Sequence, residues 1–184
     1  MNMKELYQKK VVPQLKEQLG YKNIMAVPRI SQVVVNTGFG KLIATKTGDD
    51  AEKTVQAIVA DLSQITGQKA QLTTAKKSVA GFKLREGIVI GAKITLHGKK
   101  MYDFLDRFIG FVLPRSRDFL GLNASAVDNS GNLTIGIKEH LVFPVISPEK
   151  VRNVFGLEVT VVTTAKTREE GLALFKALKF PIKE

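Results

Sequence analysis

The chain has 184 residues, enough to bury a continuous core, and we expect one domain over residues 1–184. Because cysteine is absent, disulfides, thiolate metal sites and thiol nucleophiles are excluded. The 28 Lys and Arg residues against 17 Asp and Glu residues give a formal charge of +11, which predicts a polyanionic partner. No signal-peptide pattern or long apolar run is visible, so we expect a cytoplasmic protein with no membrane partner.

Apolar residues at helical spacing predict a helix near the N-terminus that ends before Gly20: Leu6, Val11, Leu15 and Leu19. Pro13 lies inside this pattern and should kink the helix or restart it. The next run of β-branched residues, 29–36, predicts a strand. We expect this strand to end in a flexible turn at residues 37–40, where two glycines occur.

A second helix is predicted between Asp49 and Gly67. Asp49 and Glu52 are spaced as a capping box, and Gly67 stands where a left-handed C-cap is expected. The apolar stripe of this helix consists of Ala51, Val55, Ile58, Val59, Leu62 and Ile65. Residues 69–87 then carry many charges and no sustained periodicity, so we expect a long loop there.

Alternating residues predict a strand over residues 88–97, with one apolar and one polar face. The expected core face holds Ile90, Ala92, Ile94 and Leu96, and the polar face holds Lys93, Thr95 and His97. An apolar stripe from Met101 to Val112 then predicts a helix that ends at Leu113 and Pro114.

The remaining elements complete the predicted fold. Residues 115–156 look irregular, and we expect a hairpin or short helices there. A strand at residues 157–164 and a helix beginning with a capping box of Thr167 and Glu170 follow. This order predicts an α+β fold: an antiparallel-rich sheet with helices packed on one face, a ferredoxin-like (RRM-like) variant with long loop insertions.

The predicted loop at residues 69–87 is the strongest local indication of nucleic-acid binding. Residues 66–100 contain eight Lys and Arg residues against Glu86 alone, which is +7 of the total +11. A solvated surface loop is the plainer interpretation, but it does not explain so one-sided a charge. The residues expected to contact RNA are Lys69, Lys76, Lys77, Ser78, Phe82, Lys83 and Arg85. Phe82 could stack on a base, although anchoring the loop to the core is the favoured role.

The polar strand face is a second possible RNA surface, with Lys93, Thr95 and His97 joined by Gln32 and Asn36. An ordinary exposed strand face is the alternative. These strands lack the aromatic residues on which single-stranded RNA stacks, so structured RNA, recognised through its shape and backbone, fits better.

Metal, cofactor and catalytic sites are not indicated. Residues 37–41 do not complete a phosphate-binding glycine motif, and His97 and His140 lie far apart without clustered carboxylates. An enzymatic alternative casts Arg29 and Asn36 as the catalytic pair of a small acyl-phosphate hydrolase, but it leaves the basic loop unexplained. A generic nucleic-acid chaperone is a further alternative.

Short segments along nearly the whole chain resemble, in order and spacing, bacterial-type large ribosomal subunit protein five. These segments are residues 27–29, 34–36, 66–69, 75–83, 113–115, 117–119, 131–132, 139, 143–144 and 163–166. The resemblance implies a non-enzymatic protein of the central protuberance that binds 5S rRNA. It further implies contacts with 23S rRNA, P-site tRNA, small-subunit head protein thirteen and other central-protuberance proteins.

The same resemblance implies roles for individual residues. Arg29, Asn36, Gln68 and Thr95, with Lys93 beside them, would form the 5S rRNA surface, and the basic loop would reach tRNA and 23S rRNA. Candidates for an intersubunit bridge are Pro114, Arg115, Arg117, Lys138 and Glu139. One departure lies at residues 128–131, which read Asp-Asn-Ser-Gly where the family usually has Asp-Gly-Arg-Gly, so a basic contact is absent there.

Overall fold

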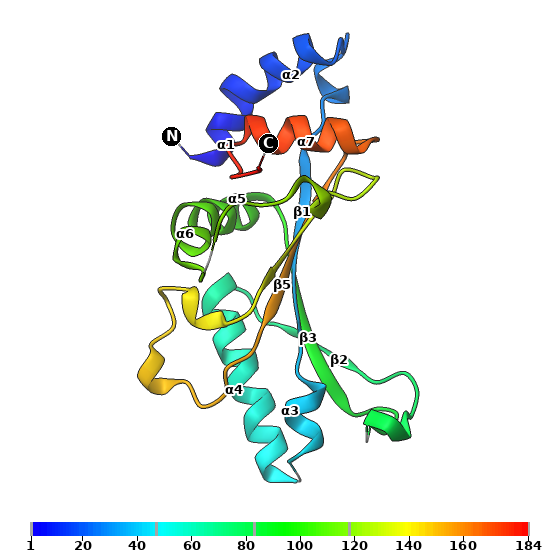
Figure 1. The fold of residues 1–184 in the computed structure, drawn as a ribbon, viewed down its shortest axis with the longest axis vertical. Helices are drawn as coiled ribbons and strands as arrows, with labels where there is room; N and C mark the ends of the chain where they lie inside the picture. The colour runs from blue at the N-terminus through cyan, green and yellow to red at the C-terminus, as the bar shows by residue number, and fades with distance from the viewer. Residues whose placement is uncertain (1, 47, 83, 118, 184) are drawn as a thin grey trace. The chain divides into compact units, whose positions relative to one another are not determined.

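The computed structural model describes residues 2–46, 48–82, 84–117 and 119–183. Its centre is a five-stranded antiparallel sheet with the strand order β2-β3-β1-β5-β4 (Figure 1). The strands are β1 (Ile30–Gly38), β2 (Gln71–Thr74), β3 (Val89–Leu96), β4 (Leu133–Ile137) and β5 (Leu157–Thr163). The predicted α+β class with an antiparallel sheet is therefore confirmed.

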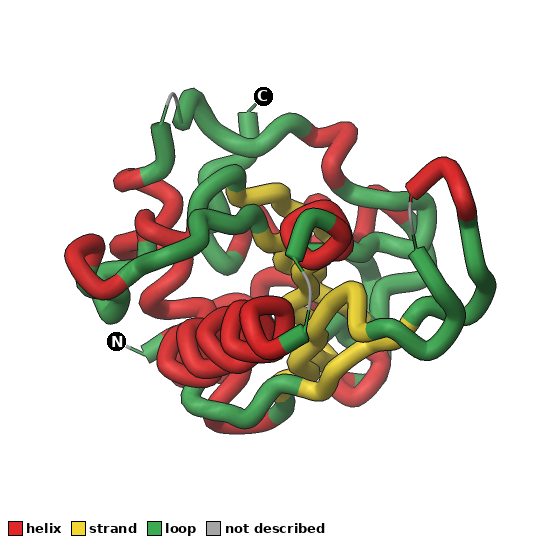
Figure 2. The backbone as a smooth tube through the Cα atoms, turned by 90° about the horizontal axis from the view of Figure 1, so that it is seen from below, coloured by secondary structure: helices red, strands yellow, loops and turns green. Residues whose placement is uncertain are grey.

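Helical segments precede, separate and follow the strands (Figure 2). The α-helices are α1 (Met3–Leu6), α2 (Val12–Gln18), α3 (Gly40–Ala44), α4 (Asp49–Thr66), α5 (Gly98–Arg107), α6 (Leu113–Arg115) and α7 (Arg168–Ala177). Two π-helical turns occur at Tyr7–Val11 and Phe108–Val112. Short 3-10 turns lie at Ile24–Ala26, Ala80–Phe82, Ala124–Ala126, His140–Val142 and Pro148–Lys150.

The chain divides into two compact units. The first comprises residues 1–34, 96–135 and 159–184, and so carries α1, α2, α5, α6 and α7. The second comprises residues 35–95 and 136–158, and carries α3, α4 and β2. One domain over residues 1–184 stays a prediction.

Strand alternation agrees with the sequence pattern. In β3, Ala92, Ile94 and Leu96 are buried while Lys93 is exposed, as the alternation of apolar and polar residues predicts. In β5, buried and more exposed residues alternate in the same way from Leu157 to Thr163. One side of each of these strands therefore faces the core and the other is accessible.

Both π-helical turns lie in the first unit, and each ends two residues before a proline, Pro13 or Pro114. The Val12 N–H donates to the Tyr7 carbonyl and the Leu113 N–H donates to the Phe108 carbonyl, each five residues back. Proline lacks an N–H and crowds the carbonyl four residues before it, so a widened turn lets the chain stay helical. The predicted break at Pro13 is thus a local widening. The predicted end at Leu113 and Pro114 was wrong, because the helix continues to Arg115.

The start of α4 differs from the predicted capping box. Gly48, with a φ of 56°, is the N-cap, and Asp49 is the first helical residue. That backbone conformation favours glycine, and the acidic residues of the first turn still interact favourably with the helix dipole. The helix ends as predicted at Gly67, which adopts the left-handed conformation with a φ of 71°. A short helix, α3, also replaces the predicted flexible turn after residue 38.

Candidate nucleic-acid interface

The basic segment expected as a loop is a strand followed by a hairpin arm. β2 pairs antiparallel with β3, with Gln71 opposite Lys93 and Thr73 opposite Gly91. We call residues 75–88 the basic arm, because they continue this pairing beyond the sheet (Figure 1). The predicted long loop over residues 69–87 was wrong at residues 71–74, which form β2. This strand is largely exposed, and its polar sequence lacks the apolar alternation that indicates a strand.

Backbone hydrogen bonds join the two sides of the basic arm. The Ala75 N–H donates to the Ile88 carbonyl at 2.8 Å, and the Gly87 N–H donates back to the Ala75 carbonyl at 3.0 Å. Nearer the tip, Val79 and Leu84 exchange a pair of bonds at 3.0 and 3.2 Å. Among the described residues, the two sides of the arm are therefore paired by backbone hydrogen bonds.

The basic side chains of this region are accessible. Lys76, Lys77 and Arg85 are exposed on the arm, and Lys69 is exposed just before β2. In the part of the chain that the structure describes, none of them forms an ion pair, so these charges are available to a partner. Lys83 lies outside the described residues. Phe82 belongs to the 3-10 turn at the arm's tip, and its side chain is not described.

Ser78 has a structural role in the arm besides its expected RNA contact. Its hydroxyl oxygen accepts a hydrogen bond from the backbone N–H of Glu86 at 2.9 Å. This bond ties the side of the arm that carries Lys76 and Lys77 to the side that carries Arg85.

Within the second unit, polar residues of neighbouring strands lie on one face. The Phe39 N–H donates to the Ile90 carbonyl, which aligns antiparallel β1 and β3. Asn36 on β1 and Lys93 on β3 are both exposed, and the two strands are neighbours in the sheet. The structure thus brings together two of the residues predicted for the 5S rRNA surface.

Gln68 is hydrogen-bonded to β3, the strand that carries Lys93. Its side-chain nitrogen donates to the backbone carbonyl oxygen of Thr95 at 3.2 Å. The backbone carbonyl oxygen of Gln68 accepts a hydrogen bond from the Thr66 hydroxyl at 3.2 Å, so both the side chain and the backbone of Gln68 are hydrogen-bonded. Gln68 and Thr95 are half-buried, which leaves part of each side chain accessible.

Arg29 belongs to the first unit and is exposed. Its N–H donates to the Thr164 hydroxyl at 3.0 Å, and its carbonyl accepts from the Thr164 N–H at 2.9 Å. Burial raises the pKa of Tyr7 to about 12, and the nearby positive charge of Arg29 opposes this shift. Burial likewise raises the pKa of Tyr102, again opposed by Arg29.

The residues that hold Arg29 were not identified from the sequence. Tyr7 donates from its hydroxyl to the Pro28 carbonyl at 3.1 Å, which fixes the segment before Arg29. Thr164 lies 135 residues further along the chain, so no local spacing indicates the pair. The only available signal was that Thr164 falls within the family-like segment 163–166.

The proposed bridge residues are accessible within each unit. Pro114 and Arg115 in α6, together with Arg117, are exposed in the first unit. Lys138 and Glu139 are exposed in the second unit, between β4 and the 3-10 turn His140–Val142. Exposure is what a docking role requires.

His140 is a buried structural residue. Its Nδ1 accepts the Phe155 N–H at 3.4 Å, its ring stacks on Phe155 at 3.9 Å, and its Nε2 lies 3.6 Å from an Asp61 carboxylate oxygen. Burial lowers the pKa of His140, while Asp61 opposes this shift. No group of three or more potential metal-ligating side chains occurs among the residues that the structure describes.

Comparisons with known families match most of the chain. Residues 23–85 match the family model described as Ribosomal protein L5, and residues 89–182 match the model that describes the C-terminus of the same ribosomal family. Among the described helices, none has the length and apolar character that crossing a membrane requires.

Proposed function

Because the chain belongs to the ribosomal protein L5 family, a structural rather than enzymatic family of the large subunit, we propose that it binds 5S rRNA. We further propose that it helps attach this RNA to the central protuberance. The observation that carries the 5S rRNA proposal is a set of accessible polar and basic side chains in the second unit, Asn36, Lys93 and Gln68, of which Gln68 is held by its bond to the Thr95 carbonyl. Folded RNA supplies the phosphates that such groups bind.

The proposed 5S rRNA contacts come from both units. Arg29 from the first unit, and Asn36, Gln68, Lys93 and Thr95 from the second, offer positive charge, amide groups and a hydroxyl. Such groups bind phosphate, ribose hydroxyls and base edges without stacking. The Gln68 bond to Thr95 supports this proposal, because it fixes one polar group beside another before RNA binds.

The basic arm is proposed to contact 23S rRNA and P-site tRNA. Its contact residues would be Lys69, Lys76, Lys77, Ser78, Phe82, Lys83 and Arg85. The arm's hydrogen-bonded pairing favours this role, because it presents basic groups from both sides of one hairpin.

The remaining proposed partners are proteins. We assign Pro114, Arg115, Arg117, Lys138 and Glu139 to contacts with small-subunit head protein thirteen across the subunit interface. Other central-protuberance proteins would be neighbours. A ferredoxin-like arrangement within a single domain, with no metal or cofactor, completes the proposal.

A gel-shift titration of the purified protein against 5S rRNA tests this function. We expect tight binding that persists with excess tRNA as competitor and weakens as salt increases. If about five phosphates are neutralised, the slope of log affinity against log salt should be about −4. Binding that tRNA abolishes would reduce the protein to a generic nucleic-acid chaperone, and a flat salt dependence would contradict electrostatic positioning.

A further inference from the structure

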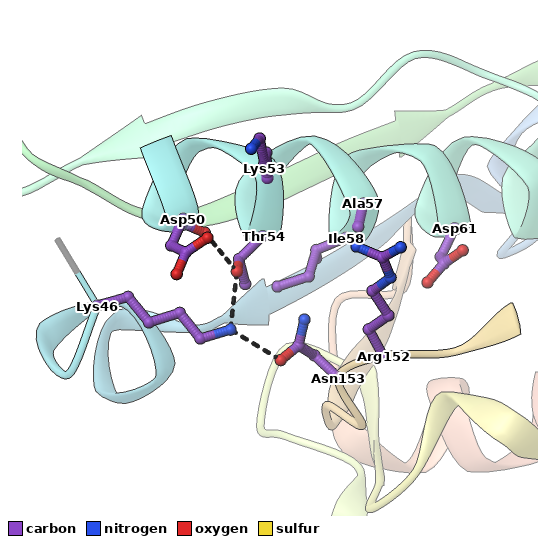
Figure 3. Close-up of a pocket in the computed structure, with 9 residues that line it drawn as sticks. All are labelled: Lys46, Asp50, Lys53, Thr54, Ala57, Ile58, Asp61, Arg152 and Asn153. Carbon is purple, nitrogen blue, oxygen red and sulfur yellow. Dashed lines mark hydrogen bonds between the residues drawn. The ribbon is translucent and has the colours of Figure 1, made fainter. Parts of the chain in front are cut away.

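A polar pocket of about 380 Å³ lies along one side of helix α4 in the second unit. Figure 3 shows its lining: one side comes from the helix, the other from Lys46 and from Arg152 and Asn153 ahead of β5. The volume falls within the range of small-molecule sites, which begins at about 300 Å³. None of its lining residues belongs to the proposed 5S rRNA surface, the basic arm or the bridge candidates.

Lys46 supplies a fixed positive charge to this pocket. Its ammonium donates to the Thr54 hydroxyl at 2.8 Å and to the Asn153 side-chain oxygen at 3.1 Å (Figure 3). Both acceptors are neutral, and among the described residues Lys46 has no ion-pair partner. An ammonium has three N–H donors, so one donor and a whole charge remain for a ligand.

The Lys46 ammonium is held in place rather than free to move. Thr54 is 5% exposed, and its hydroxyl also donates to the Asp50 carbonyl at 2.7 Å, which fixes the oxygen that Lys46 contacts. Lys46 itself is half-buried. A charge held by two bonds at the wall of a pocket needs little reordering when an anion binds.

Arg152 adds a second cation. Figure 3 shows its guanidinium extending toward α4, between Ala57 and Asp61. Among the described residues it makes no ion pair, so its planar donors can bind two oxygens of one phosphate. Lys53 also lines the pocket, from the opposite side of the helix to Lys46 in this view.

The pocket also contains acceptors, which narrows the choice of ligand. Asp50 and Asp61 line it together with the three cations Lys46, Lys53 and Arg152. A bare phosphate group would meet these carboxylates as repulsive neighbours. A ribonucleotide, by contrast, carries hydroxyl donors for the carboxylates beside a phosphate for the cations.

From this combination we infer that the α4 pocket binds one ribonucleotide unit of an RNA strand, with its phosphate at Lys46 and Arg152 and its ribose hydroxyls at Asp50 or Asp61. The inference rests on the proposed RNA-binding function and adds a contact outside the surfaces assigned above. The residues assigned here were not indicated by the sequence.

Residue-resolved NMR of the full chain tests the pocket directly. Uridine 5′-monophosphate, its 2′-deoxy analogue and inorganic phosphate are titrated while the amide signals of Thr54, Ala57 and Asn153 are followed. We expect saturable shifts with the ribonucleotide and binding several-fold weaker with the other two probes. Lys46→Met, which keeps most of the side chain, should weaken ribonucleotide binding about tenfold, the usual effect of losing a charge-assisted hydrogen bond.

Lys41→Met in α3 is the matched control, because Lys41 is an exposed lysine of the same unit that does not line this pocket. It should leave the affinity within about twofold. Arg152→Gln, at an exposed position, should weaken binding even if Lys46→Met perturbs the local fold. Absence of saturable shifts at the pocket would overturn the inference, and equal affinity for inorganic phosphate would overturn the ribonucleotide assignment. Neither result would affect 5S rRNA binding in the gel shift, so failure of the proposed function is separately visible.

Discussion

The side-chain nitrogen of Gln68 donates a hydrogen bond to the backbone carbonyl oxygen of Thr95 at 3.2 Å. This bond joins the segment after α4 to β3, next to the exposed Lys93. Two residues that are 27 positions apart thus take fixed places on one proposed RNA surface.

Replacing Gln68 by Ala should weaken 5S rRNA binding about tenfold, since it removes both a polar RNA contact and the bond that positions it. The salt slope should stay nearly constant, because no charge is removed. Gln64→Ala is the control, since Gln64 is an exposed glutamine in α4 outside the proposed surface. Equal affinities for the two variants would contradict the role of Gln68.

The basic arm should act through charge. The double variant Lys76→Gln and Lys77→Gln removes two proposed phosphate contacts, so the salt slope for ribosomal RNA containing the arm's binding site should become shallower by about two. Lys9→Gln with Lys10→Gln removes an adjacent exposed pair from the first unit and serves as the control. An unchanged slope in the arm variant would show that these lysines do not contact phosphates.

A close approach of two glycines should make Gly171→Ala destabilising. A Cβ atom at position 171 would lie 2.5 Å from the Cα of Gly131, closer than any real contact, and the obstacle is backbone. We expect a loss of about 2 kcal/mol in the free energy of unfolding, as for other overpacked sites. Urea denaturation measures the change. Gly110→Ala, in a helical turn with open space around the site, should be neutral or slightly stabilising.

The buried imidazole of His140 should make stability depend on pH. Burial holds its folded-state pKa below the ordinary value of 6.5, so the unfolded chain binds the proton more readily. Its stabilising contribution is therefore present above pH 6.5 and is lost as the pH falls toward the lower folded value. Asp61 has the opposite effect on stability, at lower pH. Burial raises its pKa above 3.8, so protonation in acid removes the free-energy cost of burying its charge.

The contribution of His140 can be isolated by substitution. Chemical denaturation at pH 7 and pH 5.5 should show a smaller loss of stability for His140→Gln than for the wild type. The exposed His97→Gln is the control and should follow the wild type. If the wild type and His140→Gln lose the same free energy between the two pH values, the predicted linkage is wrong.

Elements with a strong period were predictable from the sequence. β3 shows period-two burial and α4 shows buried residues at Ile58, Leu62 and Ile65, because one face of each element must meet the core. β2 was missed since its side chains are largely exposed, which removes the apolar alternation that identifies a strand. The cap at Gly48 was missed because a glycine conformation, rather than a side-chain bond, starts the helix.

The candidate site was predictable in its residue types and less so in its geometry. The concentration of charge around Lys76 and Lys77 is a property of the sequence itself. By contrast, the bonds of Arg29 to Thr164 and of Lys46 to Asn153 join residues more than a hundred positions apart. Such pairs arise from tertiary folding, which local spacing does not encode.

The paired backbone of the basic arm also affects the thermodynamics of assembly. Fixing one flexible residue costs about 1–2 kcal/mol of conformational entropy, and a disordered loop would lose that free energy on meeting RNA. The bonds from Ala75 to Ile88 and between Val79 and Leu84 are formed within the protein, so much of this ordering is completed when the chain folds. A larger share of the electrostatic attraction between the arm and the RNA then contributes to the net free energy of binding.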